Sequence, residues 1–325
     1  MTIIDNGYSN YTIVIPAVAT EIEKKAAYKL QHYLREMSGT KLDVIPEDRP
    51  WQSHAIYVGS CNSAKKLNID FPALEEDGFS VRTQGQDLFI CGGKRKGTLF
   101  GVYDFLEQVG CRKYSPDAEL IPKKKLLRIP QYNITEIPVF HYRETLMPDA
   151  SDPDYAEWHK LHHRSEREKD WGMWVHTFDD LIPPEKYFNE HPEYFSLNNG
   201  VRSSKTQLCL SNPNVLDLVI LHLKELISKN PLANHWSISQ NDTYGPCECS
   251  GCENIDNQYG GVPSGSIIHF VNQVAERFPN KVISTLAYQY SRKAPEGIKP
   301  AENVNIVLCT IELNRSRPIR SDPSS

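Results

Sequence analysis

Carboxylate, amide, imidazole and aromatic side chains directly follow several apolar runs beyond residue 139. These candidates are Arg143, Glu144, Trp174, His176, Gln240, Asn241, Asp242, Tyr288, Tyr290 and Glu312. Two carboxyl groups on one rim can cleave a glycosidic bond, because one protonates the leaving oxygen while the other acts as nucleophile or activates water. Aromatic faces stack on sugar rings, and amides bond their hydroxyls. The residues therefore predict a carbohydrate site.

The three candidate catalytic carboxylates differ in their surroundings. Asp242 and Glu312 each end a strongly apolar run, whereas Glu144 follows Arg143, and an ion pair would explain that pairing equally well. A carboxylate at a strand end can also simply cap the next helix. The remaining candidates are predicted to bind substrate, and Arg143 or His176 could hold a sugar carboxylate.

The tryptophans leave two readings open. Trp158, Trp171 and Trp174 could form a stacking wall for a sugar. Buried tryptophans are just as common, because the large apolar ring stabilises a core.

Three cysteines form a second chemical pattern. Cys247, Cys249 and Cys252 have C-x-C-x₂-C spacing. Three thiolates could hold a structural Zn²⁺ with a fourth ligand from elsewhere in the chain. A disulfide between two of them, or three unpaired thiols in a loop, are the alternatives. We expect no other cofactor.

An α/β domain is predicted over residues 1–130. Apolar strands at 11–16, 42–46, 55–59, 79–83 and 88–91 alternate with two amphipathic helices, one after Thr20 and one over 98–109. Thr20 and Glu23 form a capping box, and Gly39 suits a helix end. The glycines around Lys96-Gly97-Thr98 lack the order of a phosphate loop, so we expect a tight turn into a helix.

Residues 139–325 alternate strands with helices after a proline-bounded linker at 130–138. The expected strands cover 140–145, 174–178, 207–211, 235–240, 282–289 and 305–312, and the clearest helices cover 215–229 and 267–278. This rhythm predicts parallel βα units. The fold class is therefore α/β: an N-terminal sandwich-like α/β domain followed by a (β/α)8 TIM-type barrel, with candidate site residues at the carboxyl ends of its strands.

Only six of the eight barrel strands are found, so we expect a barrel that is incomplete at its C-terminus. Open strand edges would then favour pairing with a second copy of the chain, giving a homodimer.

Composition and charge narrow the classes of partner that we expect for this chain. The net charge of −5 and pI of about 6.1 give no basic surface for nucleic acid. No apolar run approaches the roughly 20 residues of a membrane helix. Met1–Asn10 has no signal pattern, so the chain is expected in the cytoplasm, or in the periplasm or outside the cell if a signal was removed.

Several stretches resemble known carbohydrate-active families. Gly97–Tyr114 resembles the end of the N-terminal domain of family-67 α-glucuronidases and family-20 hexosaminidases. Residues 174–178 (WVHTF), 191–197 (HPEYFSL), 207–213 (QLCLSNP) and 237–252 (SISQNDTYGPCECSGC) resemble a bacterial group, the domain-of-unknown-function family 4838. The resemblance implies a glycoside hydrolase, similar to α-glucuronidases, that acts on a polysaccharide or oligosaccharide.

The resemblance also suggests roles. Family-20 enzymes carry an Asp-Glu pair where this chain has Asn241-Asp242, so their mechanism is in doubt here. Similarity to the inverting family-67 enzymes suggests Asp242 as general acid and Glu312 as base or stabiliser. A non-catalytic carbohydrate-binding protein and an inactive, truncated hydrolase are the competing hypotheses.

Overall fold

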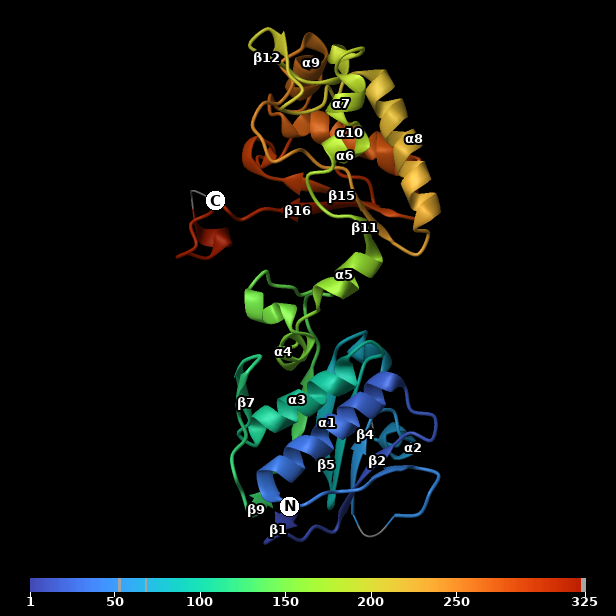
Figure 1. Ribbon diagram of the computed structural model, residues 1–325, viewed down its shortest axis with the longest axis vertical. Helices are drawn as coiled ribbons and strands as arrows, with labels where there is room; N and C mark the ends of the chain where they lie inside the picture. The colour runs from blue at the N-terminus through green and yellow to red at the C-terminus, as the bar shows by residue number, and fades with distance from the viewer. Residues whose placement is uncertain (52–53, 68, 323–325) are drawn as a thin grey trace. The chain divides into compact units, whose positions relative to one another are not determined.

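The computed structural model describes residues 1–51, 54–67 and 69–322. The chain forms two units, unit 1 over Met1–Arg164 and unit 2 over Ser165–Ser325 (Figure 1). The predicted linker at 130–138 does not separate them. It contains β10 (Asn133–Glu136), which pairs antiparallel with β5 (Phe79–Gln84) and so belongs to the sheet of unit 1.

Unit 1 is built on a six-stranded mixed sheet with the order β10-β5-β6-β4-β2-β3. The four strands at one side are parallel, and β5 pairs antiparallel with both β6 and β10. The parallel strands are β2 (Tyr11–Ile15), β3 (Val44–Pro46), β4 (His54–Val58) and β6 (Asp87–Gly92). All five N-terminal strands expected from the sequence are present, with ends shifted by a few residues.

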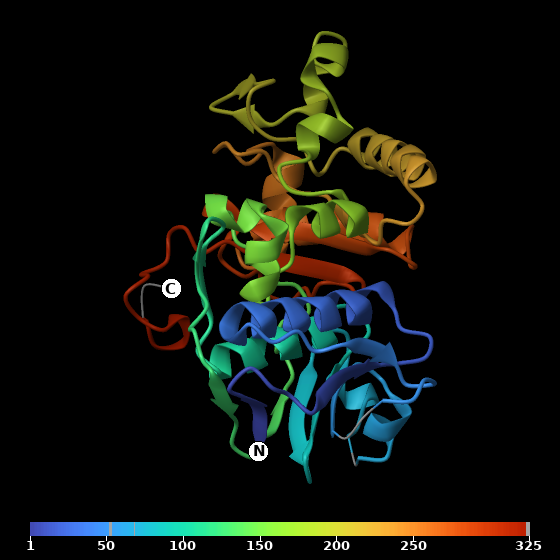
Figure 2. The same cartoon turned by 60° about the horizontal axis from the view of Figure 1, so that its bottom comes forward.

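Two helices cover one face of this sheet. They are α1 (Glu21–Ser38) and α3 (Gly97–Gln108), which lie side by side in both views of the chain (Figures 1 and 2). Alternate residues of the strands, such as Ile13 and Ile56, pack beneath them in the larger core. The opposite face carries a smaller cluster that includes Val14 and Tyr57. Both faces are thus covered, as expected for parallel strands.

The ends of α1 follow local chemistry. The Thr20 side chain accepts from the backbone of Glu23, whose carboxylate accepts from the backbone of Thr20, so the predicted capping box is present. Gly39 ends the helix at φ 80°, a conformation that costs glycine little.

The glycines before α3 allow close backbone packing. A Cβ on Gly92 would collide with the backbone of Gly97, and one on Gly97 would collide with the carbonyl of Gly78. The tight turn into a helix expected from the sequence is therefore what these residues form.

The rest of unit 1 consists of short elements: β1 (Thr2–Asp5) paired with β9 (Leu126–Arg128), β7 (Arg112–Ser115) paired with β8 (Ala118–Leu120), α2 (Asn62–Lys65) and α4 (Pro153–Trp158). α5 (Arg164–Asp170) begins at the last residue of unit 1.

Unit 2 contains a four-stranded parallel sheet whose order follows the chain, β11-β14-β15-β16. The strands are β11 (Trp171–Met173), β14 (His235–Ser237), β15 (Val282–Ala287) and β16 (Val304–Leu308). This sheet is open, and residues 165–322 form no closed barrel, whereas the sequence predicted a TIM-type barrel that is incomplete at its C-terminus. The parallel βα character that the sequence predicted is confirmed.

Three of the six strands expected beyond residue 139 are wrong. Residues 140–145 lie in unit 1 without strand structure, and residues 174–178 form the loop after β11 and the start of α6 (Phe178–Leu181). Residues 207–211 have only one bridge, between Phe195 and Leu208. Apolar alternation is present in each segment, but none has a neighbouring strand with which to form a ladder.

Helices α8 (Pro213–Lys229) and α10 (Ser264–Glu276) match the two predicted helices and contribute to the second core. Val219 and Phe270 from these helices pack with Trp236 and Ile283 from the sheet. No helix among the described residues is both long and apolar enough to cross a membrane.

Candidate functional site

The carboxyl ends of β11, β14 and β15 bring His176, Asp242 and Tyr288 together. We call these three residues the rim. The Tyr288 hydroxyl donates to Asp242 Oδ1 at 2.9 Å, and the rings of His176 and Tyr288 lie 5.8 Å apart between centroids. The hydrogen bond to Asp242 raises the pKa of Tyr288, so this hydroxyl stays a donor. The sequence placed all three residues in one site, and the structure makes them neighbours.

The backbone of His176 holds the imidazole in one orientation. Its φ of 58° is rare for a residue with a side chain, and its N–H donates to Ser239 Oγ at 2.9 Å. Nδ1 lies 2.8 Å from the carbonyl oxygen of Gln240, so Nδ1 must carry a proton. The neutral ring therefore presents Nε2 as an acceptor.

Gln240 joins two strands and is directed away from solvent. Its side chain is 1% exposed, and Nε2 donates to the carbonyl of Tyr288 at 3.1 Å. Its Oε1 accepts a short hydrogen bond from Ser291. The sequence predicted a substrate contact here, but this amide positions Tyr288 instead.

Asn241 likewise directs its amide inward. Nδ2 donates to Asp179 Oδ1 at 2.8 Å and to the carbonyl of Thr206 at 2.7 Å. Its backbone N–H donates to Gln207 Oε1, while Gln207 Nε2 donates to the carbonyls of Asn241 and Thr243. These contacts fix the backbone directly before Asp242. Burial raises the pKa of Asp179.

Gln207 is a residue that the sequence reasoning missed as part of the site. It lies in a stretch expected to be a strand, and its side chain is 2% exposed. The sequence offered only its position in the segment QLCLSNP. Nothing in the sequence connects this segment to Asn241.

Glu312 lies four residues beyond β16 rather than at its end. One of its oxygens is 3.9 Å from the guanidinium of Arg292, which follows β15. A long, partly exposed pair of this kind contributes little stability. β16 is the neighbour of β15 in the sheet, so Glu312 follows the strand next to the one that Tyr288 follows.

The aromatic candidates separate into exposed and buried groups. Trp174 is 39% exposed, with the Arg167 guanidinium 4.2 Å from its ring centroid and Trp171 edge-on at 4.5 Å. Tyr290 instead packs against the second core, where burial raises its pKa. Trp158 is 1% exposed in the core of unit 1. Of these three residues, Trp174 is the most exposed, and the Arg167 guanidinium lies over its ring.

Arg143 and Glu144 belong to unit 1. The Arg143 guanidinium donates to Asp77 Oδ2 at 3.1 Å and to the carbonyls of Phe140 and Lys160. Glu144 accepts from the Tyr142 hydroxyl at 2.6 Å. The structure thus gives Arg143 a bridging role within unit 1 in place of the expected strand end.

A cavity of about 770 Å³ in unit 1 lies apart from these residues. Glu23 lines it, but this carboxylate already accepts from the backbones of Thr20 and Ser60. Volume alone therefore does not make this cavity the better candidate for chemistry.

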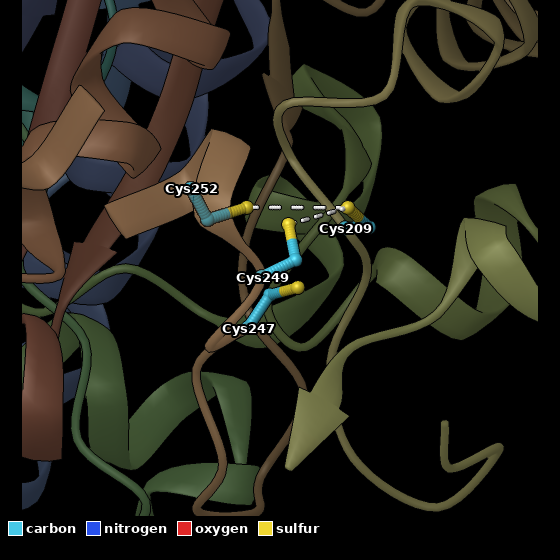
Figure 3. A group of neighbouring side chains, drawn as sticks. All are labelled: Cys209, Cys247, Cys249 and Cys252. Carbon is cyan, nitrogen blue, oxygen red and sulfur yellow. Dashed lines mark hydrogen bonds between the residues drawn. The ribbon is translucent and has the colours of Figure 1, made fainter. Parts of the chain in front are cut away.

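Four of the five cysteines of unit 2 gather at a separate place. Cys209 joins Cys247, Cys249 and Cys252, and their four sulfur atoms all lie within 4.8 Å of one another (Figure 3). The structure thus places a fourth cysteine beside the three that the sequence singled out. All eight cysteines of the chain are free thiols.

Two family models match successive parts of the chain, and the change between them falls within unit 1. A family described as "Domain of unknown function (DUF4838)" matches residues 113–324, which is more than half of the sequence. The glycosyl hydrolase family 67 N-terminus matches residues 7–105. The chain belongs to the DUF4838 family, and its N-terminal part relates it to glycoside hydrolases.

A curated relative supports the N-terminal relationship. "Probable alpha-glucuronidase A" of Aspergillus terreus is 27% identical over 93 residues, which cover 28% of this chain. The matched part is 11% of the relative's length.

Solved structures of glycoside hydrolases are also similar in part. An exo-β-N-acetylglucosaminidase of Vibrio harveyi has a TM-score of 0.45 at 10% identity, over 95% of this chain and 55% of that one. A β-N-acetylhexosaminidase of Bacteroides fragilis has a TM-score of 0.46 at 10% identity, over 95% and 68%. The chain spans about half to two thirds of the length of these proteins.

Proposed function

We propose that the chain is a glycoside hydrolase in which Asp242 and Glu312 are the two catalytic carboxyl groups. The observation that carries this proposal is the contact between Asp242 and Tyr288 beside His176, at the carboxyl ends of adjacent parallel strands. Catalytic residues of βα enzymes come from such strand ends.

The order of the sheet supports a barrel as its parent architecture. The four strands are parallel and follow the chain without a reversal, whereas a doubly wound sheet reverses its order at a switch point. We infer that β11, β14, β15 and β16 are consecutive strands of a (β/α) barrel.

The proposed reaction divides the work between the two carboxyl groups. One donates its proton to the glycosidic oxygen as the bond to the anomeric carbon breaks. The other takes a proton from the water that attacks this carbon. Glu144 has no part in the proposal, because its contact with Tyr142 lies in unit 1.

The roles need an experiment, because the sequence resemblance and the geometry favour different assignments. The resemblance suggests Asp242 as acid. Asp242 accepts a hydrogen bond from the Tyr288 hydroxyl, and a base or a nucleophile can be held in position by such a contact.

We infer that the substrate is an α-linked uronide in a plant or host glycan. The relationship to family-67 enzymes supports this by analogy. Trp174 would stack on the sugar, and His176 Nε2 would accept from one of its hydroxyls.

The test is a hydrolysis screen with aryl glycosides, including uronides, on the chain and on Asp242→Asn and Glu312→Gln. Loss of turnover in both variants supports the pair. If Asp242 is the acid, Asp242→Asn retains activity on substrates with good leaving groups such as 4-nitrophenolate. If it is the base or nucleophile, activity is lost on all of them.

Wild-type activity in both variants would overturn the carboxylate pair. Sugar binding by calorimetry without turnover of any substrate would favour a binding module, for which the exposed Trp174 ring is the supporting feature.

A further inference from the structure

Three separate segments of unit 2 meet at the four cysteines. Cys209 follows the bridge between Phe195 and Leu208, and Cys247 lies in the loop after β14. Cys249 is the N-cap residue of α9 (Ser250–Gln258), and Cys252 lies in its first turn. Both residues therefore lie at the start of the same helix.

The sulfur positions fit a tetrahedral metal ion. Cys209 Sγ lies 3.5 Å from Cys249 Sγ and 4.0 Å from Cys252 Sγ (Figure 3). A zinc ion bound at about 2.3 Å by four thiolates needs sulfur–sulfur separations of about 3.8 Å. A disulfide needs about 2.05 Å between its two sulfurs, so the observed spacing fits a shared ion better.

Polar groups around the cluster stabilise negative sulfur. The Leu197 backbone N–H donates to Cys247 Sγ at 3.4 Å, and the Arg202 guanidinium does so at 3.6 Å. The Ser211 hydroxyl lies 3.3 to 3.6 Å from three of the sulfur atoms. Such outer contacts orient and tune the ligands of a metal site.

The cluster is also protected from solvent. Cys209, Cys247 and Cys252 are 3%, 8% and 1% exposed, and Leu197 packs against them. Three buried thiols and one half-buried thiol with so few apolar neighbours form a poor hydrophobic core. A closed set of four ligands, with no open position, is typical of a structural rather than a catalytic site.

We propose that Cys209, Cys247, Cys249 and Cys252 bind one structural Zn²⁺. The ion joins the segment around residues 195–211 to the loop 241–249 and to α9. Gln207, two residues before Cys209, bonds the backbone of Asn241, so the ion stabilises the stretch that carries Asp242.

The experiment measures metal in the full chain, purified without a metal-affinity resin from zinc-supplemented medium. We expect about one zinc per chain by elemental mass spectrometry. Cys209→Ser should lose most of it, whereas the control Cys309→Ser, outside the cluster, should keep it. Equal zinc in wild type and Cys209→Ser would overturn the proposal.

Two further measurements use the wild-type chain, so a variant that fails to fold does not decide the outcome. Cobalt exchanged into the protein should give the intense thiolate charge-transfer and visible d–d bands of tetrahedral sulfur coordination. Alkylation in denaturant with chelator and without reductant should modify all eight cysteines. Failure to bind zinc or cobalt, or a count of six thiols or fewer, would show that no such site exists. Both readouts are independent of hydrolysis.

Discussion

At the scale of single residues, the rim depends on the Tyr288 hydroxyl. The sequence predicted that Tyr288 belongs to the site, but not which group its hydroxyl contacts. Tyr288 was expected to touch substrate, and the structure shows that its hydroxyl donates to Asp242. The types and order of the rim residues were therefore predictable from strand ends. Their hydrogen bonds were not, because these depend on the turn of each loop after its strand.

The Tyr288 hydroxyl should matter for turnover. We expect Tyr288→Phe to lower kcat/KM by about 10-fold, because one charge-assisted hydrogen bond to the reacting carboxylate is lost. Initial rates on the best aryl glycoside measure this. Tyr244→Phe is the matched control, since Tyr244 is 67% exposed in the loop that carries Asp242. Equal rates in all three proteins would remove Tyr288 from the site.

Asn241 illustrates an amide whose role the sequence could not distinguish. Amides at strand ends suit sugar binding, but this one is 7% exposed and bonds Asp179 and Thr206. Long-range partners such as Thr206 come from a segment that local patterns wrongly assigned to a strand.

Asn241→Ala should therefore act on stability. We expect it to lower the free energy of unfolding of unit 2 by about 2 kcal/mol, because buried partners are left unsatisfied. Urea denaturation followed by circular dichroism checks this, with Asn254→Ala on the exposed side of α9 as the control. A loss of sugar affinity at unchanged stability would restore the substrate-binding role.

At the scale of elements, helices were predicted better than strands. α1, α3, α8 and α10 each have an apolar face repeated over three or more turns, and α1 also has its capping box. Strands depend on a partner that a local pattern does not reveal. β11 was therefore placed a few residues late, and residues 207–211 were given a ladder that does not exist.

The same limit applies to the cysteine cluster. Cys247, Cys249 and Cys252 are recognisable by spacing within one short stretch. Cys209 lies in a different segment and resembles any isolated buried cysteine. Only the folding of the loop around residues 195–211 against α9 identifies it as the fourth member.

At the scale of the whole molecule, unit 1 has its own buried electrostatic network. Asp77 is 4% exposed and accepts from Arg95, Arg143 and His162. Burial alone would raise its pKa, but the hydrogen bonds from His162 and Arg95 outweigh this and hold the pKa well below its usual range. Arg143 belongs to this network. Its replacement would therefore change the stability of unit 1, and this effect would come first in interpreting any change in sugar binding.

Asp77 should make the stability of unit 1 depend on pH. Its folded pKa is lower than its unfolded value of about 3.9, so its contribution is present above that pH and is lost as the pH falls. We expect Asp77→Asn to lower the free energy of unfolding by about 3 kcal/mol at pH 7, because it removes the buried negative charge that Arg95 and Arg143 contact. The difference from wild type should shrink below about pH 4. Urea titrations at several pH values test this, with exposed Asp117→Asn as the control. A constant difference down to pH 2 would contradict the ion-pair account.

Separate cores predict separate unfolding. The buried side chains of unit 1 and of the sheet in unit 2 form distinct clusters, so calorimetry should resolve two transitions. Asp77→Asn should lower only the transition of unit 1. A chelator should lower only that of unit 2, because binding to the folded state alone adds stability that is lost with the ion. A single transition shifted by both treatments would show that the units unfold together, and a chelator without effect would count against the zinc site. Asp77→Asn therefore identifies the transition of unit 1 through its buried network, and the chelator identifies the transition of unit 2 through the proposed metal site.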